Sequence, residues 1–442
     1  MKTNAPGAPR KPKVSLGMIV KNEEDNLPAC LASVADLVDE IVVVDTGSTD
    51  RTKEIAQRFG AKVYDFPWVD SFAAARNEAL RHSTGEWSLR LDADDRLDEE
   101  NRRRLRNLFA GLKDEIAGYA VKYIGVASAG SDETVINDVR LFRNHPSIRW
   151  KYRIHELIAP ALKQAGANIY PTDMVIHTVG YQDAGILRRK QERNRRLLLM
   201  EDADHPNDPY MLFHLGWNYV SCGETAQGLP YLQRSLDLAK PDDTFVGLVY
   251  GQLARGYYQI GRRAESLAVS RQGQRWFPQY AELVFLESIL LGELGDLQGS
   301  EACLRRLLDP TAGYVATDMG LCSYKARQNL AVIYSRQRRF SEAEAEWRRV
   351  LAEQPGYVPA WLSLADLWLS AGRISDLEQA VQSLQAQAST PGIADLLQAR
   401  VCLTRKDFTA AKECLKRAAS IAALTPWARR MLGEVTKQES GA

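Results

Sequence analysis

The second half of the chain repeats itself with a period of 34 residues. A fixed period of this length is typical of helix pairs that stack on one another, because each pair leaves apolar surface that only a neighbouring pair covers. Repeats that start at Pro209 and Tyr324 show the pattern best, and starts near 247, 281, 358 and 392 keep the same spacing. The large and small residues that define the pattern are Leu212, Leu215, Gly216, Tyr219, Gly223 and Leu232, then Leu330, Ala331, Tyr334, Ala343, Trp347 and Pro355.

This spacing resembles that of tetratricopeptide repeats, and it predicts six repeats over residues 209–425. Helical sequence over residues 185–208 is expected to form a connecting helix, and residues 426–442 a capping helix and tail. Aromatic side chains at repeat positions are interpreted as packing residues, with the lining of a concave binding face as the alternative. The repeats therefore predict an all-α solenoid with a partner surface, and they leave the partner open.

Residues 13–184 alternate instead between strand-like and helix-like patterns. The β-branched runs KVSLGMIV, EIVVVD, AKVYDF and WSLRLD are separated by segments with helical spacing. Such alternation predicts a mostly parallel, Rossmann-like sheet with helices on both faces. The predicted fold class is thus an α/β N-terminal domain followed by an all-α repeat array. Residues 1–12 are Pro-rich and basic and precede no apolar signal-peptide core, so we expect a disordered leader.

Charge and hydropathy disfavour several classes of partner. The 442 residues carry 57 Lys+Arg against 56 Asp+Glu, and a nucleic-acid-binding protein needs a basic field that such a balance does not give. No apolar run approaches the roughly 20 residues that span a bilayer. The six cysteines form no CxxC pair, as in reduced thiols of a cytosolic protein. We expect a cytoplasmic protein without nucleic-acid partner or transmembrane segment, and peripheral contact with the inner face of the membrane is left open.

Polar clusters follow three of the four strand-like runs, as VKNEEDN, DTGSTDRT and LDADDRLD. Open α/β sheets bind ligands beyond the carboxyl ends of their strands, so these clusters are candidate binding residues. None contains GxGxxG or GxxxxGK[ST], which disfavours a Rossmann dinucleotide site and a P-loop. Each cluster alone has a plain alternative, because Asn and Asp often cap helices. Asp95 is either a neighbour of a ligand or the cap of the following helix.

Taken together, the runs VSLGMIVKNEEDNLPACLASV, DEIVVVDTGSTDRT, ARNEAL and LRLDADD resemble the inverting glycosyltransferases of family 2, which have the GT-A fold. The joining of such a domain to repeats is similar to bacterial glycosyltransferases that include the peptide S-glycosyltransferases of glycocin biosynthesis. The resemblance implies transfer of a hexose or N-acetylhexosamine from a UDP-sugar to a protein, peptide or glycan acceptor. The repeats would bind the acceptor or a partner, or associate as a homodimer. A lipopolysaccharide or lipid-linked acceptor is one alternative, and an interaction scaffold with an inactive transferase domain is another.

The resemblance also implies roles for the residues that match the family's motifs. Asp45 would accept a hydrogen bond from the nucleotide base, and Asp92 would contact the ribose. Asp92 and Asp94 form the DxD element, which would hold Mn²⁺ or Mg²⁺ at the diphosphate, since these ions prefer hard oxygen ligands and use few protein carboxylates. His177 would be a third ligand, with packing or capping at the domain junction as the alternative. The remaining residues implied in nucleotide-sugar binding are Asn22, Glu23, Arg76 and Asn77.

An inverting transfer also needs a carboxylate that takes the proton of the acceptor during in-line attack. The family places this base after the DxD element, and the sequence RIHE ends there in His155 and Glu156. We predict Glu156 as the base and His155 as its helper or as a neighbour of the metal. A thiol acceptor would need a strong base less, because part of it is already thiolate near neutral pH.

Overall fold

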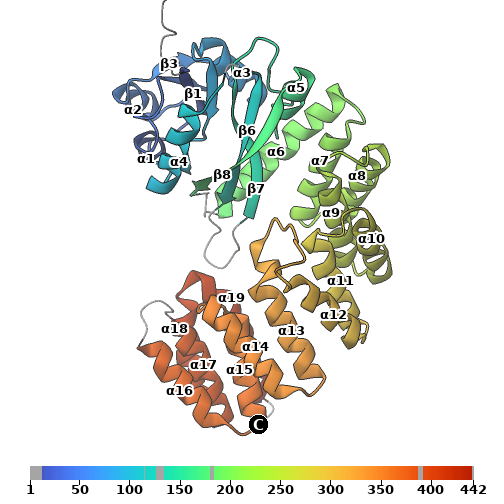
Figure 1. Ribbon diagram of the computed structural model, residues 1–442. Helices are drawn as coiled ribbons and strands as arrows, with labels where there is room; N and C mark the ends of the chain where they lie inside the picture. Colours follow the sequence, from blue (N-terminus) through green and yellow to red (C-terminus); the bar gives the residue numbers. More distant parts are fainter. Residues whose placement is uncertain (1–11, 114, 126–133, 180–183, 387–391, 441–442) are drawn as a thin grey trace, which may run out of the picture. The chain divides into compact units, whose positions relative to one another are not determined.

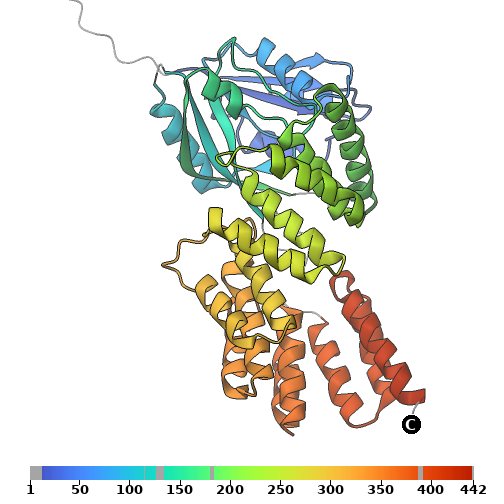
Figure 2. The ribbon, with the colours of Figure 1, turned by 90° about the vertical axis from the view of Figure 1, so that its right-hand side faces the viewer.

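The computed structural model describes residues 12–113, 115–125, 134–179, 184–386 and 392–440 (Figures 1 and 2). Almost all of the predicted leader therefore lies outside the described residues. The chain divides into two compact units, of which the first extends to Ile260 and the second begins at Gly261. No helix within the described residues is long and apolar enough to cross a membrane.

The first unit is built on one mixed sheet with the strand order β3-β2-β1-β4-β7-β6-β8-β5. β1, β2, β3 and β4 pair in parallel, as do β6 and β8, whereas β7 runs antiparallel between β4 and β6. The sheet thus keeps the parallel half that the sequence predicts and adds a mixed half, in which β7 is antiparallel to both of its neighbours. The strands are β1 Val14–Val20, β2 Glu40–Asp45, β3 Lys62–Asp65, β4 Trp87–Arg90, β5 Asp95–Arg96, β6 Ala117–Gly125, β7 Thr134–Arg143 and β8 Asn168–Thr178.

Helices cover both faces of this sheet, which is why β1 and β2 are apolar along their length. One core joins residues of β1 and β4 to α1, α2 and α4 and includes Trp87 and Phe109. On the other face Val42 and Val44 pack against Ala75 and Ala79 of α3. The helices are α1 Leu27–Ala32, α2 Thr52–Arg58, α3 Phe72–His82, α4 Glu99–Ala110 and α5 Ala159–Gln164.

The helix predicted after the first strand is shorter than its apolar spacing indicates. α1 ends at Ala32, and tight turns replace the helix as far as Leu37. The Ser33 hydroxyl donates to the Cys30 carbonyl at 2.7 Å, and such a bond offers the backbone an alternative to continued helix. Val34 and Leu37 are still buried, so the apolar pattern reports the core rather than a continuous helix.

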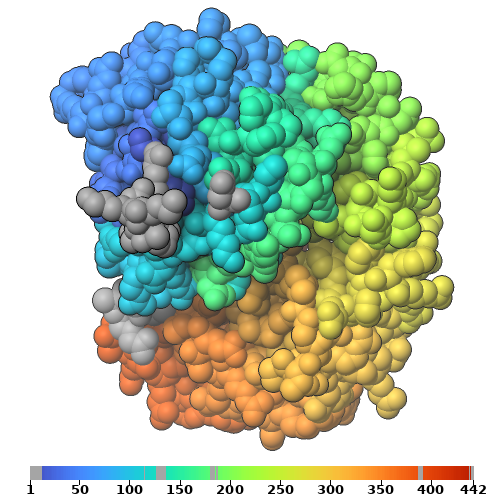
Figure 3. Space-filling model, turned by 45° about the horizontal axis from the view of Figure 1, so that its top comes forward, coloured from blue at the N-terminus to red at the C-terminus, as the bar shows by residue number. Residues whose placement is uncertain are grey.

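The first unit also contains α6 Ala184–Asp204 and the helices α7 Pro209–Ser221, α8 Thr225–Leu238 and α9 Val246–Gln259. α7 and α8 approach closely, because a Cβ added to Gly228 would lie 2.7 Å from the carbonyl oxygen of Gly216. Leu197 of α6 and Leu215 of α7 form one core with Ile154 of the α/β domain. In the space-filling view the blue, cyan and green side chains of this unit pack against one another (Figure 3).

The named elements of the second unit's described residues are all helices, and they share one continuous core. Trp347 and Trp368 are buried in it, as expected of packing residues. The first helices of successive pairs begin at 281, 324, 358 and 393, within one residue of the predicted repeat starts. Its elements are α10 Arg263–Trp276, α11 Ala281–Glu293, α12 Leu297–Leu307, η1 Met319–Cys322, α13 Tyr324–Arg336, α14 Phe340–Glu353, α15 Val358–Ser370, α16 Ile374–Gln385, α17 Ile393–Thr404, α18 Phe408–Ala419, η2 Ala422–Leu424 and α19 Thr425–Ser440.

Candidate active site

The carboxyl ends of β1, β2 and β4 lie at one edge of the sheet, and this register brings the three predicted polar clusters together. Asp45 ends β2 and is 1% exposed. Its Oδ1 accepts hydrogen bonds from the backbone N–H groups of Gly47 and Ser48 at 2.9 and 2.8 Å. Its Oδ2 is buried and has no hydrogen-bond partner among the described residues. A buried acceptor without a partner is costly, so this oxygen is suited to a ligand that donates an N–H.

Asn22 and Glu23 follow β1 and join its loop to the loop after β2. The Asn22 Oδ1 accepts a hydrogen bond from the backbone N–H of Thr49 at 2.8 Å. The backbone N–H of Glu23 donates to Thr52 Oγ1 at 2.8 Å, and its Oε2 accepts from Asn26 at 3.0 Å. These contacts give both residues a structural role at the site that the sequence pattern did not specify.

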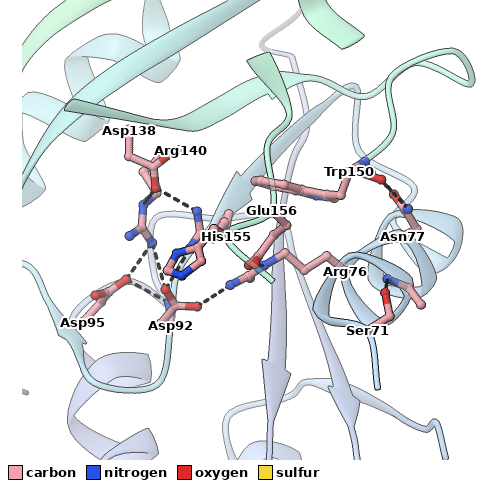
Figure 4. Close-up of polar contacts among 12 residues, drawn as sticks. Ser71, Arg76, Asn77, Asp92, Asp95, Asp138, Arg140, Trp150, His155 and Glu156 are labelled. Atoms are coloured by element: carbon pink, nitrogen blue, oxygen red, sulfur yellow. Dashed lines mark hydrogen bonds and ion pairs between the residues drawn. The ribbon is translucent and has the colours of Figure 1, made fainter. Parts of the chain in front are cut away.

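Asp92 contacts three largely buried arginines, which we call the arginine cluster: Arg76, Arg90 and Arg140. Figure 4 shows Arg76 and Arg140 beside the Asp92 carboxylate. Arg76, from α3, contacts Asp92 Oδ1 through Nη2 at 2.8 Å and Glu156 Oε1 through Nε at 2.5 Å. Arg90 and Arg140 contact Asp92 Oδ2 at 3.1 and 3.3 Å. Both oxygens of Asp92 are therefore held by guanidinium groups.

Two further carboxylates complete the cluster. Asp138, on β7, pairs with Arg90 at 2.8 Å and with Arg140 at 2.9 Å. Asp95 is fully buried, and its Oδ2 contacts Arg140 at 3.0 Å and accepts a hydrogen bond from the backbone N–H of Asp92 at 2.8 Å. Asp95 is thus no helix cap, whereas Asp98 caps α4 by accepting from the backbone N–H of Asn101.

Burial raises the pKa values of these carboxyl groups, and the nearby arginines lower them. Burial raises the pKa of Asp92, but Arg90, Arg76 and Arg140 outweigh it and hold that pKa well below its usual range. Burial likewise opposes ionisation of Glu156, and Arg76 and Arg90 outweigh it, so the pKa of Glu156 is lowered. For Asp95 burial prevails over Arg140 and raises the pKa to about 7.

The three predicted metal ligands differ in what surrounds them. Asp94 is half-buried, and its carboxylate forms no hydrogen bond or ion pair with the residues that the structure describes. Both carboxylate oxygens of Asp92 form ion pairs with the arginine cluster. His177 lies on β8 opposite Arg96, and its Nε2 is 3.7 Å from Asp98 Oδ2. Within the described ranges, no three His, Cys, Asp or Glu side chains converge to hold a metal ion.

This donor set fits a divalent metal only through Asp94. Mg²⁺ is commonly bound by one or two carboxylates, with substrate phosphates and water as its other ligands. Asp94 can supply one hard oxygen in such a shell, and a diphosphate would have to supply others.

Asn77 holds the segment before Glu156 rather than pointing at an open site. Its Nδ2 donates to the Trp150 carbonyl at 3.0 Å, and its Oδ1 accepts from the Trp150 N–H at 2.9 Å. The Trp150 ring lies against the guanidinium groups of Arg76 and Arg90, at 5.5 and 5.2 Å from its centroid. Both polar atoms of the Asn77 side chain are thus bonded to the Trp150 backbone, and its part in nucleotide-sugar binding stays a prediction.

His155 precedes Glu156, is half-buried and packs against His214 of α7. Burial lowers the pKa of His155 to about 4, because its surroundings disfavour the imidazolium, although Glu156 acts in the opposite direction. The ring is therefore neutral at neutral pH. It stacks on the ring of His214 with the centroids 3.8 Å apart.

Sequence reasoning did not find Arg90, Asp138, Arg140 and Trp150. A signal was present in β7, where Asp138 and Arg140 interrupt an apolar run two residues apart and so lie on one face. Arg90 stands two residues before Asp92 in LRLDADD and has the same spacing. Charges spaced in this way inside a buried strand indicate a buried ion-pair network.

Residues 15–158 match the family described as Glycosyl transferase family 2, and residues 325–353 match a tetratricopeptide repeat family. A TPR repeat-containing protein of Synechococcus elongatus is 38% identical over 245 residues, which are 52% of this chain and 58% of that protein. The SPbeta prophage-derived glycosyltransferase SunS of Bacillus subtilis is 25% identical over 51% of this chain and 54% of its own length.

An uncharacterized glycosyltransferase of Rickettsia typhi is 34% identical over 113 residues, which are 25% of this chain and 38% of that protein. The matched segments thus span little more than half of the first two relatives and less of the third. The matches to the two families fall on the α/β domain and on the helical repeats. Residues 15–158 therefore form a family 2 glycosyl transferase domain, which this chain joins to tetratricopeptide repeats.

Proposed function

We propose that the protein is an inverting glycosyltransferase that transfers a hexose or N-acetylhexosamine from a UDP-sugar to a protein, peptide or glycan. The observation that carries this proposal is the buried Asp45 Oδ2 without a partner, at the same sheet edge as the arginine cluster. A uracil base offers an N–H to such an acceptor. A diphosphate is suited to guanidinium groups, which bind phosphate oxygens through paired hydrogen bonds.

Glu156 is the carboxylate that we propose as base. Its side chain is 10% exposed and ionised at neutral pH, and Arg76 connects it to Asp92 on the donor side. During in-line attack it would take the proton of the acceptor as the nucleoside diphosphate leaves from the opposite face of the sugar. A lowered pKa makes Glu156 a weak base. It is therefore best suited to an acceptor with a labile proton, of which a thiol is one.

A divalent metal would add Lewis-acid stabilisation of the departing diphosphate. Asp94 is the residue that we propose to hold it. The arginine cluster would orient the phosphates, and the ion pairs of Asp92 with all three guanidinium groups would keep these arginines in place. Intact carboxylates and arginines argue for catalysis and against a scaffold with an inactive transferase domain.

The full chain, incubated with a panel of UDP-sugars and Mn²⁺, is expected to release UDP from at least one of them. Replacing Asp45 with Asn is expected to weaken UDP binding by about 10- to 100-fold in calorimetry, because the amide at this position cannot serve the base N–H as a charged acceptor does. The matched control is Asp65→Asn, the same change at the end of β3, where the side chain is exposed. If no member of the panel is bound or turned over, the proposed function is wrong.

The same assay tests the metal. Chelation with EDTA is expected to abolish turnover, and added Mn²⁺ or Mg²⁺ to restore it. Asp94→Asn is expected to lower turnover by about 100-fold, since Asp94 supplies the carboxylate ligand of the proposed site. If turnover is unchanged both in EDTA and in Asp94→Asn, the reaction does not use a metal. The proposed UDP-sugar donor would be unaffected by that result.

A further inference from the structure

Glu156 lies near the end of a short loop whose two ends are hydrogen-bonded to each other. The backbone groups of Lys151 and Leu157 exchange two hydrogen bonds, at 3.0 and 3.1 Å, and the residues between them form the loop. Tyr152 and His155 have φ angles of 74° and 52°, in the left-handed region that residues with a side chain rarely occupy. Such a backbone persists only where its surroundings hold it. The contacts of this loop therefore decide where Glu156 lies.

α6 holds the first half of the loop. The backbone N–H of Arg153 donates to Glu201 Oε2 at 2.7 Å, and its side chain pairs with Asp204. Ile154 is buried in one cluster with Leu197 of α6 and Met211 of α7. α6 thus fixes both the backbone and the apolar side chain at this part of the loop.

α7, the first helix of the repeats, makes the remaining contacts with this loop. Tyr152 Oη donates to Asp208 Oδ2, which caps α7, at 2.9 Å. Tyr210 Oη donates to the His155 carbonyl at 3.4 Å. The His155 ring stacks face to face on His214, with an angle of 7° between the ring planes.

His214 makes this contact through its ring face alone. It is 7% exposed, and neither of its ring nitrogens has a hydrogen-bond partner among the described residues. Tyr210 and Phe213 pack around the same ring at centroid distances of 4.5 and 4.8 Å. A buried imidazole without hydrogen bonds contributes by filling space and by stacking, so an aromatic ring without nitrogens can replace it.

On the side that faces the donor site, α3 contacts the same loop. The backbone N–H of Phe72 donates to the Arg153 carbonyl at 2.7 Å, and Arg76 binds the Glu156 carboxylate. The loop is therefore clamped between α3 and the pair α6 and α7. The carboxylate of Glu156 is turned toward the arginine cluster, as Figure 4 shows.

We infer that α7 is part of the catalytic machinery, and that Tyr210 and His214 are positioning residues that hold the backbone of His155 and thereby place Glu156. This inference rests on the proposed role of Glu156 as base. The first repeat is then a structural component of the transferase rather than an appendage that only binds a partner. The compact unit that contains the site accordingly extends through α9 to Ile260.

The test compares His214→Ala with His214→Phe in the full chain, with His145→Ala on an exposed loop as the matched control. The readouts are kcat and KM for UDP release from UDP-glucose and UDP-N-acetylglucosamine, and amide hydrogen exchange of residues 151–157. His214→Ala is expected to lower kcat by about 10- to 100-fold with KM changed less than about twofold, because a misplaced base affects the chemical step. It is also expected to speed exchange of the loop, and His214→Phe to restore most of both properties.

Tyr210→Phe serves as a second variant that keeps the packing and removes only the hydroxyl, so it guards against a loss of folding in His214→Ala. It is expected to lower kcat by about three- to tenfold with unchanged KM. The inference is overturned if His214→Ala and Tyr210→Phe keep the wild-type kcat and loop exchange, or if His214→Phe restores neither. If the wild-type protein binds no UDP-sugar, the proposed function fails, and the exchange data still decide whether α7 holds the loop.

Discussion

Glu156→Gln is expected to lower kcat by about 10²- to 10⁴-fold, the usual contribution of a general base. The amide has nearly the shape of the carboxylate and keeps one oxygen that can accept from Arg76, which binds Glu156 Oε1 at 2.5 Å. It cannot take a proton from the acceptor. The Kd for UDP, measured by calorimetry, is not expected to rise, because the loss falls on the chemical step and the neutral amide competes less with a diphosphate for Arg76.

The matched control is Glu78→Gln, two residues after Arg76 on the same helix, where the carboxylate pairs with Arg81 on the surface. This variant is expected to keep both kcat and Kd. Wild-type turnover by Glu156→Gln would show that the acceptor loses its proton without this carboxylate. Such a result would favour an acceptor that is already ionised, such as a thiolate.

Arg140→Met is expected to destabilise the folded state by about 3–5 kcal/mol, measured by urea unfolding. Arg140 is almost fully buried and pairs with Asp92, Asp95 and Asp138. Methionine keeps much of its volume and leaves Asp95, which is fully buried, without a cation. The cost therefore comes from the buried Asp95 carboxyl group, which either stays charged without a partner or has to take up a proton, rather than from a cavity.

The double variant Arg140→Met with Asp95→Asn separates these causes. It is expected to recover at least half of the loss, since the amide carries no charge that needs a partner. Arg58→Met is the control, and it is expected to cost less than about 1 kcal/mol because Arg58 is exposed and pairs with Glu54 on the surface of α2. A double variant as unstable as Arg140→Met alone would mean that Arg140 acts through packing.

Strand ends and repeat starts could be predicted because they depend on local pattern. Asp45 closes an apolar run, and the helices that begin at Pro209 and Tyr324 follow a periodic spacing that the chain itself displays. The partners of the arginine cluster could not be predicted from the sequence, because they depend on the position of β7, which lies antiparallel between β4 and β6. Nothing in the sequence of β7 fixes that neighbour.

Asp95 and Asp98 also show that local sequence does not predict contacts with distant strands. Asp98 caps α4, and the acidic residues after it are typical of a helix start. Asp95 has similar sequence surroundings but enters the interior, because it meets Arg140 from a distant strand. The sequence pattern alone predicts no role for His214, for the same reason. Its function depends on a ring that is 59 residues earlier in the chain.

One guanidinium group, that of Arg76, touches a donor-side carboxylate and the base at the same time. A diphosphate that entered the site would compete with Glu156 for this group. Losing the cation would raise the proton affinity of Glu156, so the base would become stronger once the donor is bound. The ion pair would then impose a compulsory order, donor first and acceptor second. In product-inhibition kinetics UDP would compete with the UDP-sugar but not with the acceptor, and competition with both would exclude that order.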